Sequence, residues 1–124
     1  MKVRIQHNSI RFRLKEPEVA YFKKHGFIKE TLVLGNDTGA QLQFALQVTS
    51  DEILSAHYLS NMVTINVPAH TADAWTETDL VGFDGVVNTV SGSPLKVLVE
   101  KDFKCLDGSE EDNIGSYPNP MQHC

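Results

Sequence analysis

Alternating apolar and polar residues dominate this chain, a pattern typical of β-strands with one buried face. Residues 2–14 show it first, and a two-residue turn at His7-Asn8 would place their apolar side chains on one face of a hairpin. The alternation fixes the register, because a slip of one residue would bury arginines. Further strands are predicted at 27–34, 41–48, 53–58, 62–67, 80–83, 86–90 and 95–99.

Two short helices are predicted between the strands. The first, of about ten residues, opens with Lys15-Glu16-Pro17-Glu18, which supplies a proline and two glutamates, and its last turn contains Lys23, Lys24 and His25, followed by Gly26. These are the residues that helix termini prefer. A second helix is predicted over 69–77 and carries Trp75, which we expect to be a core residue.

Short turns between consecutive strands predict antiparallel pairing. The predicted fold is therefore α+β, with a twisted, mainly antiparallel sheet of about six to eight strands, able to curl into a partial barrel, and two short helices packed on it. No internal repeat is visible. We expect one α+β domain over residues 1–103 and an irregular acidic C-terminal tail over residues 104–124 that docks back on the domain.

Composition and charge exclude several classes of protein. The chain has 124 residues, of which 41% are hydrophobic, and a formal net charge of -5, which argues against a nucleic-acid binder. No apolar stretch approaches the roughly 20 residues needed to cross a bilayer, and the N-terminus does not resemble a secretory signal. We therefore expect a cytoplasmic protein without a membrane partner.

Basic residues are concentrated in the N-terminal hairpin. The predicted register places Arg4 opposite Arg11 and Lys2 opposite Arg13, where like charges repel. One interpretation is a binding site for phosphate, a carboxylate ligand or an acidic partner, since guanidinium groups bind such anions in bidentate fashion. The alternative is a solvated face paired with the protein's own acids. The acids available for this are Glu30, Glu100, Asp102 and the run at 110–112.

A second candidate site lies near the C-terminus. Cys105, His123 and Cys124 offer two thiolates and one imidazole, which are good zinc ligands. However, no Cys-x-x-Cys pair is present, and adjacent ligands are awkward in a closed tetrahedral site. The thiols are otherwise free or joined in a disulfide. The histidines that could activate Cys105 for catalysis are His25, His57 and His70. Their positions are typical of structural residues, so no catalytic residue is assigned.

The tail has two further features, an acidic run at residues 110–112 and a stiff Tyr-Pro-Asn-Pro segment at residues 117–120. An extended segment of this kind can lie along a groove of its own domain or of a neighbour. Docking of the acidic run on the cationic hairpin, of the same chain or of a second protomer, would join both unusual features in one hypothesis.

Three stretches together resemble a known family: residues 2–14, residues 75–83, and residues 98–106 with the Tyr-Pro-Asn-Pro segment. Over nearly its whole length the chain looks like a small family of uncharacterised bacterial proteins, classed as a domain of unknown function. The resemblance implies a stand-alone bacterial protein and no activity. A fainter likeness is to triphosphate-tunnel enzymes, which hold polyphosphate with inward basic residues. Their opening Glu-x-Glu-x-Lys strand is absent, because residues 3–7 contain no carboxylate.

The function predicted from these features is non-catalytic. We expect a small cytoplasmic binding or interaction domain whose N-terminal hairpin attracts a small anionic ligand, a protein partner or a second copy of the chain. The alternative is a small metal-binding protein or enzyme that uses Cys105, His123 and Cys124, with zinc as the candidate metal.

Overall fold

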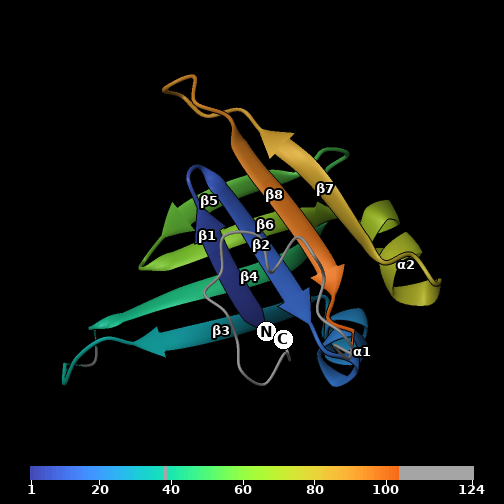
Figure 1. The fold of residues 1–124 in the computed structure, drawn as a ribbon, viewed down its shortest axis with the longest axis horizontal. Helices are drawn as coiled ribbons and strands as arrows, with labels where there is room; N and C mark the ends of the chain where they lie inside the picture. Colours follow the sequence, from blue (N-terminus) through green and yellow to red (C-terminus); the bar gives the residue numbers. More distant parts are fainter. Residues whose placement is uncertain (38, 104–124) are drawn as a thin grey trace, which may run out of the picture.

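Two four-stranded β-sheets packed face to face form the protein in the computed structural model, which describes residues 1–37 and 39–103 (Figure 1). The strands are β1 (Lys2–Gln6), β2 (Ser9–Leu14), β3 (Phe27–Val33), β4 (Gln41–Thr49), β5 (Ser55–Leu59), β6 (Met62–Pro68), β7 (Gly82–Val87) and β8 (Leu95–Lys101). The helices are α1 (Glu16–His25) and α2 (Ala69–Glu77). The predicted α+β class, with eight strands and two helices, is confirmed.

Each sheet consists of two hairpins, and the inner strands of the two hairpins pair with each other in parallel. The strand order is β1-β2-β8-β7 in sheet A and β3-β4-β6-β5 in sheet B. The parallel pairs are β2–β8 and β4–β6, and the other four pairings are antiparallel. Pairing is thus mainly antiparallel, as predicted, but the strands form two sheets instead of one, and the sheets do not close into a barrel.

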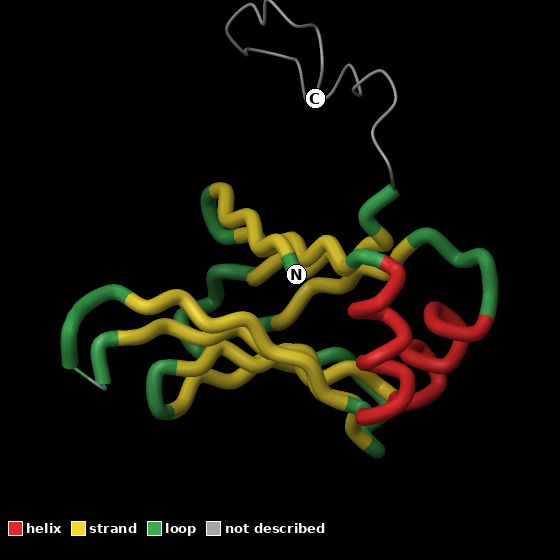
Figure 2. Tube along the Cα trace, turned by 90° about the horizontal axis from the view of Figure 1, so that it is seen from below, coloured by secondary structure: helices red, strands yellow, loops and turns green. Residues whose placement is uncertain are grey.

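Both helices carry the chain from one sheet to the other. Helix α1 leads from β2 of sheet A to β3 of sheet B, and α2 leads from β6 of sheet B to β7 of sheet A. Figure 2 shows them together at one end of the two layers, so they close that end of the core. Helix α1 ends as the sequence predicts, because Gly26 adopts a left-handed φ of 68° and its N–H donates to the Phe22 carbonyl at 2.7 Å.

The order of elements repeats once along the chain. A hairpin, a helix and a second hairpin occur as β1-β2-α1-β3-β4 and again as β5-β6-α2-β7-β8. Exchanging the two repeats converts the strand order of sheet A into that of sheet B. Equivalent backbone hydrogen bonds confirm the correspondence: Lys96 N–H donates to the Asn8 carbonyl at 3.1 Å, and Gln43 N–H donates to the Asn61 carbonyl at 2.8 Å.

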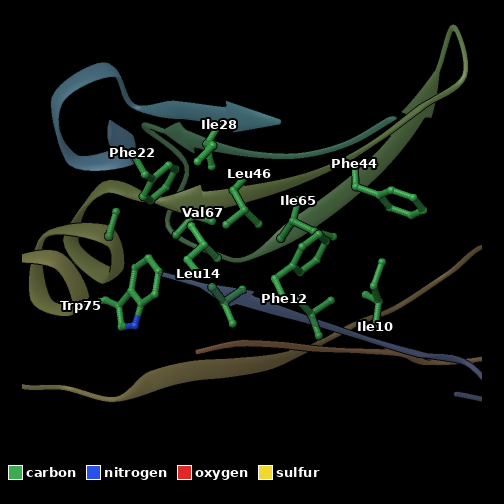
Figure 3. Close-up of a cluster of buried hydrophobic side chains, with 13 residues drawn as sticks. Ile10, Phe12, Leu14, Phe22, Ile28, Phe44, Leu46, Ile65, Val67 and Trp75 are labelled. Atoms are coloured by element: carbon green, nitrogen blue, oxygen red, sulfur yellow. The ribbon is translucent and has the colours of Figure 1, made fainter. Parts of the chain in front are cut away.

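Each repeat supplies half of one shared core (Figure 3). Buried residues of the two repeats correspond to each other. The correspondence follows from their distance to the two-residue turns and to the helix starts, and from the register of the parallel strand pairs. The corresponding residues are Phe12 and Ile65, Leu14 and Val67, Phe22 and Trp75, Phe44 and Val97, and Leu46 and Val99. No repeat is visible in the sequence because the equivalent residues are rarely identical, and only the pattern of inward positions is shared.

Trp75 is a buried residue of this core, as the sequence predicts. It is 0% exposed, and its ring meets the rings of Phe22 and Phe83 edge-on at centroid distances of 6.1 Å and 5.4 Å. Its indole N–H donates to the Val81 carbonyl at 3.0 Å, so the one polar atom of the side chain is also paired. Trp75 therefore joins both helices to strand β7.

One predicted break in the chain is wrong. Asp84-Gly85 was expected to separate two strands, but both residues lie inside β7. Asp84 pairs with Leu98, and a Cβ atom at position 85 would lie 2.7 Å from Cδ2 of Leu54. The Leu54 side chain occupies the space that a larger residue would need, so glycine here reflects close packing instead of a turn.

The N-terminus is held by two carboxylates. The Met1 ammonium pairs with Glu18 and, at 2.9 Å, with Glu30, which links the start of β1 to α1 and β3. Glu18 also accepts a hydrogen bond from the Lys15 N–H at 2.8 Å, and its own N–H donates to the Lys15 carbonyl at 2.9 Å, so the two residues are joined at the start of α1. Partial burial alone would raise the pKa of Glu18, but the ammonium and the Lys15 N–H hold that pKa below its ordinary value.

Replacing Trp75 by alanine should lower the free energy of unfolding by about 3–5 kcal/mol, the usual cost of removing a buried aromatic side chain. Urea denaturation followed by circular dichroism would measure the change. Val90→Ala is the control, because Val90 is fully exposed and the substitution should change stability by less than about 0.5 kcal/mol. Equal losses in the two variants would contradict the assigned core.

Stability should depend on pH through the Met1–Glu18 contact. Folding lowers the pKa of the Glu18 carboxyl, so this group stabilises the protein at a pH above its pKa in the unfolded chain, which is about 4.3. The contribution is lost as the pH falls through the pKa of the folded protein. Burial alone would lower the pKa of the Met1 ammonium, but Glu18 and Glu30 raise it, so its contribution is lost as the pH rises above about 8.

The matched variants for this pH dependence are Glu18→Gln and Glu16→Gln, which remove the same charge from one helical turn. Urea unfolding at pH 3–10 should show a smaller stability loss in acid for Glu18→Gln than for the parent protein or Glu16→Gln. An unchanged acid dependence in Glu18→Gln would refute the role given to this carboxylate.

Candidate functional site

The outer face of sheet A gathers the basic residues that the sequence singles out. Ile10, Phe12 and Leu14 of β2 are buried between the sheets, so the alternate residues of β2 and of its neighbours point away from the core. We call this surface the cationic face. Its charged residues are Lys2, Arg4, Arg11, Arg13 and Lys96, together with Asp84 and Glu100.

The predicted hairpin register is confirmed. Arg4 lies opposite Arg11 and Lys2 opposite Arg13 across β1 and β2. The turn has its positive φ, 51°, at His7. The structure adds a cation that the sequence could not place, because the parallel pairing of β2 with β8 sets Lys96 beside Ser9.

Two of the protein's own acids pair with this face. The Arg11 Nε–H donates to Glu100 Oε1 at 2.5 Å, and Lys2 Nζ lies 3.1 Å from Asp102 Oδ2. Glu30, the third acid considered for this role, contacts the Met1 ammonium instead. The interpretation of self-paired charges therefore holds for Arg11 and Lys2.

The cationic face is hollowed. A depression with a volume of about 600 Å³ lies over β1, β2, β8 and β7. Its polar lining consists of Arg4, Gln6, Ser9, Arg11, Asp84 and Lys96. A smaller hollow of about 330 Å³ adjoins Lys2, Arg4, Arg11 and Arg13. Most of the charged groups lining these hollows are hydrogen-bond donors, which suit the oxygen atoms of an anion.

The equivalent face of sheet B shows what the same scaffold carries elsewhere. By the strand correspondence, Thr64 stands where Arg11 stands, Asn66 where Arg13 stands, and Gln43 where Lys96 stands. The equivalents of Lys2, Arg4 and Glu100 are Ser55, His57 and Gln47. Sheet B forms with side chains that carry no fixed charge at each of these positions, so the fold does not require the charges on sheet A.

The other sequence candidates are dispersed or lie outside the described residues. The His25 ring lies against the Tyr21 ring, with centroids 4.2 Å apart and a tilt of 40°. The His57 ring contacts the Asn66 amide at 3.1 Å, and His70 is exposed at the start of α2. Within residues 1–37 and 39–103, no three His, Cys, Asp or Glu side chains group as a metal ion would need. The predicted zinc ligands lie outside these ranges, and they are Cys105, His123 and Cys124.

A larger pocket that the sequence does not reveal lies beside the helices. It has a volume of about 780 Å³ and is lined by apolar side chains such as Leu14, Val19 and Phe103. Charges of both signs surround it, namely Glu16, Lys23, Asp79, Lys101 and Asp102. No single segment carries a signal for this pocket, because distant parts of the chain form it. Its mixed charge makes it less selective for anions than the cationic face.

Comparison with known proteins gives a family without an assigned activity. A family model described as "Family of unknown function (DUF7009)" matches residues 1–121. No curated protein and no solved structure matches the chain. In the part of the chain that the structure describes, none of the helices is both long and apolar enough to cross a membrane.

Removing the carboxylate of Glu100 should destabilise the protein, because Arg11 loses its partner among like charges. For Glu100→Gln we expect a loss of about 1 kcal/mol in low salt, within the range of partly exposed ion pairs. The loss should shrink in 0.5 M NaCl, measured by urea unfolding. Glu52→Gln, an exposed change in a loop, is the charge-matched control. A loss in Glu100→Gln that does not depend on salt would contradict the ion-pair assignment.

Proposed function

The chain belongs to this family of unknown function, DUF7009, and we propose that it is a non-catalytic binding domain that holds an anionic ligand on the cationic face of sheet A. The proposal rests on the difference between the two outer faces. At the outward positions of their strands, sheet A carries five cations and two carboxylates, and sheet B carries a single cation, Lys29. A difference that the fold does not need is best explained by a ligand.

The arrangement has a cost that supports this interpretation. Like charges directly opposite each other on paired strands destabilise a sheet, by up to about 1 kcal/mol per pair. Arg4 with Arg11 and Lys2 with Arg13 are two such pairs. The carboxylates of Asp84, Glu100 and Asp102 offset part of this charge, and the five cations keep an excess of two positive charges over one face of a protein whose net charge is -5. An anionic ligand would relieve the repulsion.

The lining of the depression favours binding over catalysis. Arginine presents several N–H groups in a fixed geometry that matches phosphate and carboxylate oxygens. The hydroxyl of Ser9 already donates to the Gln6 carbonyl at 2.7 Å, so it is held as part of the turn. A hollow of about 600 Å³ can accept a small phosphorylated or carboxylated molecule or a short acidic segment of a protein.

We further propose a cytoplasmic location and a bacterial origin, in line with the sequence. A protein partner or a second copy of the chain is a possible source of the anionic group. The metal-binding or enzymatic alternative depends on Cys105, His123 and Cys124, which lie outside the described residues, and it stays a prediction.

The structure suggests its own test. A four-residue variant would give sheet A the residues of sheet B: Arg11→Thr, Arg13→Asn, Lys96→Gln and Glu100→Gln. A control variant, Lys24→Gln with Lys29→Gln, removes the same net charge away from the cationic face. We expect the four-residue variant to remain folded, because sheet B tolerates these residues.

The probes are inorganic tripolyphosphate and a hexaglutamate peptide, titrated by calorimetry at 50 mM NaCl. The four-residue variant should bind at least one of them about tenfold more weakly or worse, a loss of about 1.4 kcal/mol. The control variant should match the parent, and added salt should weaken binding by the parent. Equal affinities in the two variants would show that any binding reflects net charge alone and would refute the proposal.

A further inference from the structure

We infer that the acidic run of the same chain, Glu110-Glu111-Asp112, binds the cationic face and competes there with external anions. This inference rests on the proposed function and names a ligand that the protein itself carries.

Asp102, near the end of the described residues, lies beside the cationic face. After β8, the Asp102 N–H donates to the Leu14 carbonyl at 2.7 Å, and the Asp102 carboxylate lies 3.1 Å from Lys2 Nζ. Asp102 is therefore fixed next to the row that contains Lys2 and Arg13. The first acid after the sheet already pairs with a cation of this face.

The length of the chain beyond this point is sufficient. Glu110 lies eight positions after Asp102, and an extended chain spans about 3.3 Å per residue, so Glu110 can reach about 26 Å from Asp102. The cationic face runs from Arg13 back to Ser9 along β2, which is about 13 Å. Either hollow of the face is thus within reach of the acidic run.

The charges are complementary. Residues 104–124 contain four acidic side chains, at positions 107, 110, 111 and 112, and a single lysine, Lys104. The face offers an excess of positive charge. A segment tethered this closely acts at an effective concentration in the millimolar range, so even a weak contact would be occupied within one chain.

The neighbouring pocket is a poorer partner for this run. Phe103 lines the pocket beside the helices, but three carboxylates surround the same pocket, those of Glu16, Asp79 and Asp102. Carboxylates of the acidic run would be repelled there. The cationic face is the hollowed surface of matching charge among the described residues.

A spin label can locate the acidic run in the full-length chain. Ser109→Cys, in a background with Cys105→Ser and Cys124→Ser, places a nitroxide next to Glu110. We expect broadening of the amide signals of Arg4, Arg11 and Lys96, and unchanged signals for Ala45 and Thr64 on the opposite face. The broadening should weaken in 0.5 M NaCl and in the neutral variant Glu110→Gln, Glu111→Gln, Asp112→Asn.

Three results would overturn the inference. They are broadening confined to the helix pocket, broadening that persists in the neutral variant, and broadening that appears only between chains. The last is detected by mixing spin-labelled unenriched protein with ¹⁵N-enriched protein that lacks the label, and it would assign the acidic run to a second copy.

A titration separates this inference from the proposed function. Tripolyphosphate should bind the neutral variant several-fold more tightly than the parent, because the competing segment has lost its charge. Equal affinities would refute the inference and leave the proposed function standing. If tripolyphosphate and hexaglutamate bind neither protein, the proposed function itself fails.

Discussion

The parallel pairing of β2 with β8 and of β4 with β6 is the constraint on which the rest of the structure depends. Each pair joins a strand of the first repeat to a strand of the second, so each sheet takes one hairpin from each repeat. The helices can then close one end of the core, where Phe22 and Trp75 occupy equivalent places. Because all of the core is shared, neither repeat has an apolar face that it could bury alone.

This arrangement leaves the two outer faces free to differ. The inward residues of both sheets are apolar in equivalent positions, since packing restricts them, whereas outward residues are restricted only by strand propensity and solubility. At equivalent strand positions, the outward residues of the two sheets differ in charge, whereas the buried inward residues are apolar in both. All but one of the outward cations on the strands lie on sheet A. The internal repeat thus provides a comparison within one molecule: one face shows what the scaffold requires, and the other shows what has been added to it.

The added charges are partly balanced by acids from the second repeat. Glu100 follows Lys96 on β8, and Asp102 is held by Leu14 directly after that strand, so both reach the hairpin only once the central pair has formed. A charged face assembled in this way depends on the complete fold. The same geometry places Asp102, near the end of the described residues, beside Lys2 at the other end of the sequence.

The sequence by itself determined the local elements: both helices, the hairpin register of Arg4 with Arg11, and most of the strands. Alternation and turn chemistry act over a few residues, so they can be read without knowledge of the fold. Tertiary structure alone decided that there are two sheets, that Lys96 joins the basic hairpin, and that Gly85 packs against Leu54 inside β7. These features depend on contacts between residues far apart in the chain, for which a local pattern of apolar and polar positions contains no information.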